Sequence, residues 1–331
     1  MHSVIGHDWA VRWLRETLVN DQLRHAYCIT GPANVGKMTL ALGFARALLC
    51  TAPEIARRPC DACDACRRTA GGFHPDLRVI SLPADANALS VETMRESVVH
   101  EAALSPLTGQ RKVFIIPQMH LATTAAANAL LKTLEEPPAA VVIILLSDRG
   151  DALLPTIVSR CQVLSLRPAR QDLIEQHLVA QHSLTPAEAA LLARLSHGRL
   201  GYAKRMAADR GAWEQRRQQL DDLAGLLTAS RVERLAFAAN LAGHTDQVAA
   251  TLQTWQSWWR DVWLHQHGAA AHAVNVDRTT LLAAQAQRLS PAQARSCLQM
   301  VCRAVQLLDG NVNVRLALDV LLLRLPHLAI S

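Results

Sequence analysis

A glycine-containing loop between a predicted strand and a predicted helix is the feature that most constrains the fold of this chain. Residues Ala26–Thr30 form a short apolar run, the loop Gly31-Pro32-Ala33-Asn34-Val35-Gly36 follows, and Lys37–Leu49 have the pattern of a helix. In this context glycines let backbone N–H groups curl round phosphates, the lysine adds a positive charge, and the helix N-terminus favours an anion. The pattern predicts a phosphate-binding loop, and a glycine turn without a ligand is the alternative. The candidate nucleotide-binding residues are Gly31, Asn34, Gly36 and Lys37.

Apolar runs and helical segments continue to alternate as far as Leu166. Further strands are predicted at Leu77–Leu82, Val113–Ile116, Val141–Leu146 and Val163–Leu166, with helices at Val91–Ala103 and Thr124–Glu135. Repeated alternation of this kind predicts a mainly parallel sheet covered by helices on both faces. Strand signals disappear after Pro168, so the rest of the chain is predicted to be helical.

The length of 331 residues predicts two or three domains. We expect an α/β domain at residues 1–167 with a cysteine-rich insertion at 50–73, a small helical domain at 168–208 and a helical C-terminal domain at 209–331. In the last of these, four tryptophans at spacings of three and four share one helix face. Core packing is the favoured interpretation of this face, and a partner surface is the alternative. The tryptophans are Trp255, Trp258, Trp259 and Trp263.

Composition and charge exclude some classes of protein. The densest apolar run, Ala139–Leu146, is too short to cross a bilayer, and charged residues interrupt the first twenty positions where a secretory signal would need an apolar stretch. We therefore expect a globular cytoplasmic protein with no membrane partner. The net charge of +6 allows contact with nucleic acid but does not indicate it, because the basic residues form no long run.

Two departures weaken the phosphate loop as an ATPase centre. The position after Lys37, where a Ser or Thr hydroxyl would bind magnesium, is Met38, and Thr39 lies about 100° further round the helix. The strand that ends at Ile116 is followed by Pro117-Gln118 and not by the acidic residues that hold the metal and orient water. Nucleotide binding is therefore doubtful, and turnover by this chain is not expected.

Four of the eight cysteines are clustered, at Cys50, Cys60, Cys63 and Cys66. In a reducing compartment clustered thiols indicate a metal more often than disulfides. Four sulfur ligands with no open position are typical of structural zinc. An iron-sulfur cluster accepts the same ligands and is the less favoured alternative, because no redox motif accompanies it. His74 lies nearby and is predicted to be a loop residue.

The segment Ser159-Arg160-Cys161 lies just before the last predicted strand. On spacing alone, a solvated or salt-bridged arginine is the favoured interpretation.

Taken together, several segments resemble bacterial clamp-loader subunits of the AAA+ superfamily. They are Gly31–Lys37, the four clustered cysteines, Thr124–Pro138 with its string Asn-Ala-Leu-Leu-Lys-Thr-Leu-Glu-Glu-Pro-Pro, and Ser159–Cys161. The resemblance covers the first 166 residues well. It continues more weakly through a lid-like unit and a C-terminal domain similar to a collar, where Asn311-Val312-Asn313 precede an apolar helix. Within this family the chain resembles the delta-prime branch, because gamma and tau keep the Lys-Thr/Ser and Asp-Glu pairs that Met38 and Pro117-Gln118 replace.

The resemblance implies a five-subunit ring with delta and gamma/tau ATPase subunits, which loads a sliding clamp on primed DNA. It also implies that Arg160, with Ser159, acts as an arginine finger on ATP held by a neighbouring subunit. The chain would then be no enzyme alone but part of a DNA-directed DNA polymerase holoenzyme. Two alternatives stay open: a motor subunit that hydrolyses ATP despite its substitutions, and a DNA-binding module that uses the cysteine loop.

Overall fold

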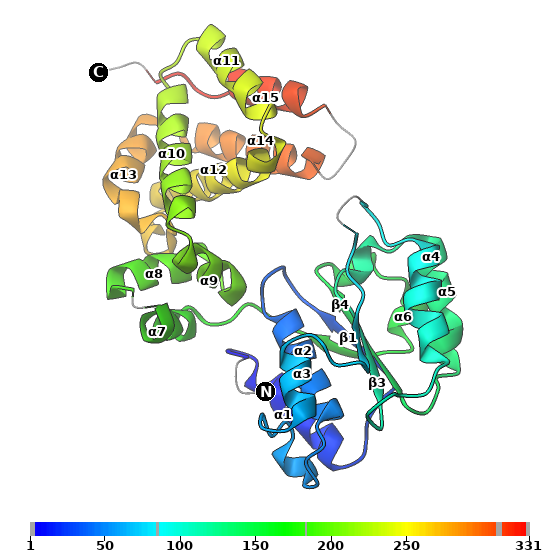
Figure 1. The fold of residues 1–331 in the computed structure, drawn as a ribbon. Helices are drawn as coiled ribbons and strands as arrows, with labels where there is room; N and C mark the ends of the chain where they lie inside the picture. The colour runs from blue at the N-terminus through cyan, green and yellow to red at the C-terminus, as the bar shows by residue number, and fades with distance from the viewer. Residues whose placement is uncertain (1–3, 84–85, 183, 309–312, 329–331) are drawn as a thin grey trace. The chain divides into compact units, whose positions relative to one another are not determined.

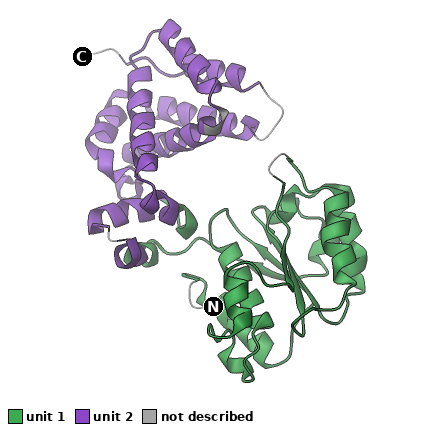
Figure 2. Ribbon diagram, in the orientation of Figure 1, with its two compact units in different colours: residues 1–176, 196–202 green, residues 177–195, 203–331 purple. Residues whose placement is uncertain are grey.

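The computed structural model describes residues 4–83, 86–182, 184–308 and 313–328 (Figure 1). The chain divides into two compact units (Figure 2). The first comprises residues 1–176 and 196–202, and the second comprises residues 177–195 and 203–331.

The first unit is built on a parallel sheet of five strands in the order β2-β3-β4-β1-β5. At its centre, Cys28 of β1 pairs with Leu145 of β4 on one side and with Val163 of β5 on the other. Because the strands are parallel, the residues that follow β1, β3 and β4 lie at the same edge of the sheet. The strands are β1 (Ala26–Thr30), β2 (Leu77–Val79), β3 (Lys112–Ile116), β4 (Val141–Ser147) and β5 (Gln162–Ser165).

Helices cover both faces of this sheet (Figure 1). Tyr27 and Ile29 of β1 belong to the core on one face, whereas Ala26 and Cys28 belong to the core on the other. Side chains alternate along a strand, so a sheet covered on both faces needs strands that are apolar throughout. The first face carries α1 (Asp8–Val19) and α2 (Lys37–Leu49), with α3 (Asp64–Ala70) packed on α2. The second carries α4 (Val91–Met94), the π-helical segment Arg95–His100, α5 (Thr124–Glu135) and α6 (Pro155–Val158).

The predicted α/β architecture is confirmed, and three of its elements have the predicted bounds: β1, α2 and α5. The strand predicted to reach Leu82 ends at Val79, although the Ile80 N–H still donates to the Ile115 carbonyl at 2.9 Å. The proline at position 83, which has no N–H, follows soon after. Sequence patterns did not predict α1 or α3.

The elements that follow Pro168 are helical, as predicted. In the second unit, Trp255, Trp258 and Trp259 are fully buried and Trp263 packs against the same core, which confirms core packing as the role of the tryptophan face. Asn311 and Val312 lie outside the described residues, whereas Asn313 caps α15 (Val314–Leu323) by accepting from the Leu316 N–H at 3.1 Å. The division at residues 167 and 208 stays a prediction.

These helices are α7 (Gln171–His182), α8 (Pro186–Leu195), α9 (Leu200–Ala208), α10 (Arg210–Leu226), α11 (Arg231–Ala242), α12 (Thr245–Gln266), α13 (Thr279–Arg288), α14 (Pro291–Leu308) and α15 (Val314–Leu323).

Candidate functional site

The predicted phosphate loop connects β1 to α2, and its conformation requires its glycines. Gly31 has a φ of +142°, and a Cβ at this position would lie 2.3 Å from the Leu166 carbonyl oxygen. Gly36 has a φ of +112° at the start of α2. Asn34 adopts a φ of +65°, a left-handed conformation that asparagine tolerates better than most residues. The loop is therefore a tight turn of the kind that the sequence predicts.

The side chain of Lys37 turns back into this loop. Its Nζ donates to the carbonyl oxygens of Gly31 at 2.6 Å and Pro32 at 2.7 Å, and it forms an ion pair with Asp148 Oδ1 at 2.6 Å. The lysine side chain is only 7% exposed. An ammonium group has three N–H donors, and these three oxygens account for all of them. In this conformation Lys37 has no donor left for a phosphate.

Two further groups bind the loop from other parts of the first unit. The Gly201 N–H donates to the Asn34 carbonyl at 2.9 Å, and a Cβ at Gly201 would lie 3.0 Å from the same oxygen. His7 Nε2 lies 3.0 Å from the Val35 carbonyl, and because a carbonyl only accepts, Nε2 carries the proton. Donors of this chain therefore hold four carbonyl groups of the loop.

The positions that would hold magnesium in an ATPase carry other groups in this chain. Met38 packs against the core on the α2 face of the sheet, and Thr39 is exposed. Pro117 and Gln118 follow β3 at the edge where the acidic residues of an ATPase would lie. The described residues at the end of β3 therefore place no carboxylate there.

Asp148 is a site residue that sequence analysis missed. It directly follows β4, which lies between β1 and β3 in the sheet, so its carboxylate reaches Lys37. The Asp148 N–H donates to His120 Nδ1 at 3.4 Å, and burial of His120 lowers the pKa of its imidazole. Sequence alone does not reveal that β4 is the strand beside β1, so the acid was expected only at the end of β3.

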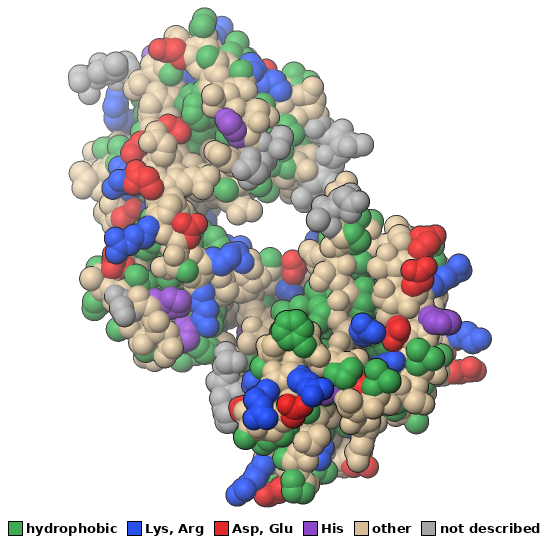
Figure 3. Space-filling view, viewed as in Figure 1, with side chains coloured by type: hydrophobic (Ala, Val, Ile, Leu, Met, Phe, Trp, Pro, Cys, Tyr) green, Lys and Arg blue, Asp and Glu red, His purple; other side chains and the backbone are tan. Residues whose placement is uncertain are grey.

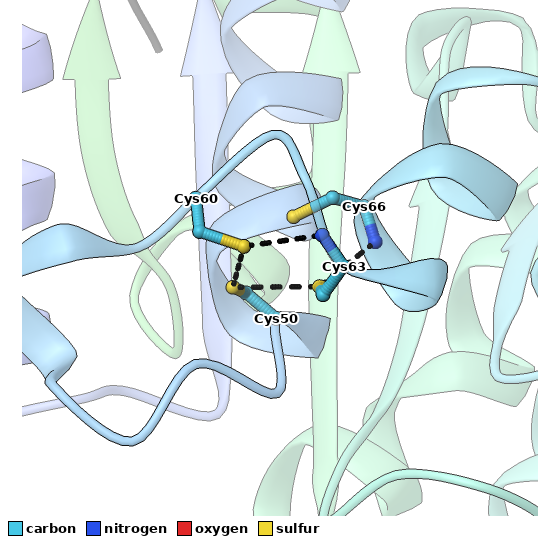
Figure 4. A group of neighbouring side chains, drawn as sticks. All are labelled: Cys50, Cys60, Cys63 and Cys66. Atoms are coloured by element: carbon cyan, nitrogen blue, oxygen red, sulfur yellow. Dashed lines mark hydrogen bonds between the residues drawn. The ribbon is translucent and has the colours of Figure 1, made fainter.

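The four clustered cysteines converge at one point (Figure 4). All four Sγ atoms lie within 4.8 Å of one another, with Cys50 Sγ 3.6 Å from Cys60 Sγ and 3.8 Å from Cys63 Sγ. A tetrahedral ion with metal–sulfur bonds of about 2.3 Å needs sulfurs about 3.8 Å apart. Cys50, Cys60, Cys63 and Cys66 therefore could bind a metal ion.

Backbone N–H groups point at these sulfurs. The N–H of Cys63 donates to Cys60 Sγ and that of Cys66 donates to Cys63 Sγ, both at 3.4 Å. Burial raises the pKa of the Cys63 thiol, but hydrogen bonds from Thr51 and Cys66 outweigh burial and lower it to about 6. Hydrogen bonds also lower the pKa of Cys60, whereas burial raises the pKa values of Cys50 and Cys66. Donors aimed at sulfur favour the thiolate, which is the form that binds metals.

His74 has a different partner. Its ring is buried, and Nδ1 accepts from the Asp76 N–H at 3.1 Å, so it stands apart from the cysteine group among the described residues. This agrees with its predicted place in the loop.

Arg160 lies at the corner between α6 and β5. Its Nη2 donates to Glu135 Oε1 at 2.6 Å and its Nη1 donates to the Thr156 carbonyl at 2.8 Å, while 34% of the side chain stays exposed. The Ser159 hydroxyl donates to the same carbonyl at 3.2 Å. Burial raises the pKa of the Cys161 thiol to about 12, so this cysteine is a neutral packing residue. The corner thus presents an anchored, partly exposed guanidinium.

Surface charge offers no simple pattern on the visible face of either unit. Lys and Arg side chains are interspersed with Asp and Glu (Figure 3). A mixed surface of this kind attracts a polyanion less than a segregated basic patch does. Among the described residues, no helix has both the length and the apolar character that a bilayer requires.

Comparison with known proteins places the chain in a family. The family described as "DNA polymerase III, delta subunit" matches residues 6–170, and its C-terminal counterpart matches residues 210–327. The DNA polymerase III subunit delta' of Escherichia coli is 33% identical over 310 residues, which cover 92% of this chain and 89% of that protein. This chain belongs to the delta-prime family of DNA polymerase III subunits. The resemblance seen in the sequence is thereby confirmed.

Other relatives match shorter stretches. The delta' subunit of Bacillus subtilis is 33% identical over 188 residues, or 56% of this chain and 55% of that protein. The tau subunit of Escherichia coli is 33% identical over 203 residues, which cover 60% of this chain but only 31% of tau. This chain therefore shares part of its length with a longer DNA polymerase III subunit.

Proposed function

We propose that this delta-prime chain is a non-hydrolysing subunit of the DNA polymerase III clamp loader and helps to load the sliding clamp on primed DNA. The observation that carries the proposal is the state of Lys37, whose three donors are taken by Gly31, Pro32 and Asp148. Met38 also replaces the hydroxyl that would bind magnesium. ATP hydrolysis needs a lysine that can contact the phosphates and a side chain that binds magnesium, and this loop offers neither.

Arg160 has the role of an arginine finger in this proposal, with Ser159 beside it in the same corner. A guanidinium that is anchored at two nitrogens and one-third exposed can approach a ligand on an adjoining subunit. In phosphoryl transfer such a group stabilises developing charge and accelerates hydrolysis by roughly 10³- to 10⁵-fold. The partners are gamma/tau ATPase subunits and delta in a five-subunit ring, which contacts the clamp and primed DNA as a complex in the cytoplasm.

Zinc is the ion that we propose for the cysteine cluster. The ligand set is all sulfur and leaves no position open for a substrate, which is typical of structural sites. Cys50 ends α2 and Cys63 caps α3, so the ion would join the insertion to the helix that follows the phosphate loop.

The test is reconstitution with the ATPase subunits of the same bacterium. An assembly that carries Arg160→Ala should bind ATP normally but lose much of its DNA-stimulated hydrolysis, measured as phosphate release. Unchanged turnover would refute the finger role. The isolated wild-type chain should show no magnesium-dependent ATPase activity, and turnover at motor rates would favour a gamma/tau-like motor subunit.

Tight, salt-sensitive binding of DNA by the isolated subunit would favour the third candidate, a DNA-binding module.

A further inference from the structure

Glu135 and Arg160 come from different elements that share one core. Glu135 is the last residue of α5, and Arg160 follows α6. The two helices pack together, with Leu134 of α5 and Ile157 of α6 buried in the same cluster. Because both backbones are fixed by this core, the 2.6 Å contact between Nη2 and Oε1 joins two well-anchored points.

The bonds at the two terminal nitrogens of the guanidinium have different effects on its orientation. The Thr156 carbonyl that binds Nη1 lies only four residues before Arg160, on the same short segment. Glu135 is 25 residues away and holds the other terminal nitrogen from a separate helix. A guanidinium is a planar, rigid fork, so contacts at two nitrogens set the direction of its plane as well as its position. Without Glu135, only Nη1 would stay held, by the Thr156 carbonyl and by the Ser159 hydroxyl at 3.4 Å, so the plane of the group could turn about that one nitrogen.

We propose that Glu135 is a positioning residue for Arg160, an inference that rests on the proposed finger role. Donors that already point at the developing charge stabilise a transition state without the need to reorganise. Glu135 is half exposed and Arg160 is one-third exposed, so water screens their attraction. The expected contribution is therefore modest, about a 2- to 5-fold effect on the rate.

Glu136 provides a matched control. It is the next residue, it has the same side chain, and it is also exposed. Among the described residues its carboxylate forms no ion pair and no hydrogen bond, and only its backbone N–H donates, to Lys132. Glu136→Ala therefore removes one surface charge from the same place without releasing Arg160.

The experiment uses the reconstituted assembly with a single active ATP site, the one next to this subunit. The other ATP sites are inactivated by substitution of their phosphate-loop lysines. DNA-stimulated hydrolysis is then measured as kcat and KM. Glu135→Ala should lower kcat about 2- to 5-fold with an unchanged KM, and Glu136→Ala should change neither. Glu135→Gln keeps an oxygen that accepts from Nη2 and should recover most of the lost rate. In the Arg160→Ala background, Glu135→Ala should have no further effect.

Three results would overturn the inference while leaving the finger role intact: Glu135→Ala behaves like Glu136→Ala, raises kcat, or lowers kcat equally with and without Arg160. The last of these would reveal a structural role for Glu135 that does not act through the arginine. If Arg160→Ala itself leaves kcat unchanged, the finger role fails and the inference fails with it.

Discussion

Replacement of Lys37 by methionine should destabilise the protein rather than remove a nucleotide contact. Methionine keeps the apolar stem but loses the ammonium group, which leaves the carbonyls of Gly31 and Pro32 without a donor and Asp148 without a partner. Hydrogen bonds from a charged donor contribute about 1.5–3 kcal/mol, and the ion pair adds at most about 1 kcal/mol because Asp148 is 38% exposed. The expected loss is about 2–4 kcal/mol in the free energy of unfolding.

Urea denaturation of the isolated chain measures this loss, and the first unit is followed separately if the two units unfold in separate transitions. Lys132→Met is the matched control, because Lys132 is an exposed lysine of α5 whose side chain has no ion pair among the described residues. In a double-mutant cycle, the coupling free energy between Asp148→Asn and Lys37→Met should be only part of the total loss, at most the contribution of the ion pair, about 1 kcal/mol. The control variant should unfold with the wild-type midpoint.

The same variants report on nucleotide. A ligand that binds the folded state raises the melting temperature. Because Lys37 has no donor left for a phosphate, we expect no such binding, and magnesium-ATP should leave the melting temperatures of the wild type and of Lys37→Met unchanged. The reasoning is refuted if Lys37→Met is as stable as Lys132→Met, or if magnesium-ATP stabilises the wild type but not Lys37→Met, since the lysine would then serve a phosphate.

Two further predictions concern the first unit. If the proposed zinc holds the cysteine insertion, treatment with a chelator should unfold that insertion, with loss of its protection from proteolysis and hydrogen exchange, and Cys63→Ser should behave like the chelator-treated protein. Insensitivity to the chelator would contradict the proposed structural metal. Asp76→Asn should cost about 1–3 kcal/mol at pH 7, because the buried carboxylate accepts from the N–H groups of Leu107, Thr108 and Gly109. Burial raises the pKa of Asp76, but these bonds outweigh burial and hold it below its usual value. Its contribution is therefore complete above about pH 4 and is lost as the pH falls through the folded-state pKa, so a constant stability difference down to pH 2 would contradict the assignment.

Local patterns in the sequence determined much of this protein. The bounds of β1, α2 and α5 follow from the apolar spacing of each segment, since the period of the apolar residues distinguishes a strand from a helix. The cysteine cluster was also predictable, because three of its cysteines lie within seven consecutive positions and the fourth ends the preceding helix. Likewise, the presence of Met38 at the position after Lys37 is enough to show that the hydroxyl that would bind magnesium is missing.

The contacts that decide how the site works are not local. Lys37 meets Asp148 only because β4 lies beside β1, and Glu135 meets Arg160 only because α5 packs on α6. Gly201 reaches the phosphate loop from far along the chain. Strand order and helix packing are set by the burial of many apolar side chains at once, and no short window of sequence contains that sum. The sequence by itself therefore determined which chemical groups this chain carries, and the tertiary structure decided which of them meet.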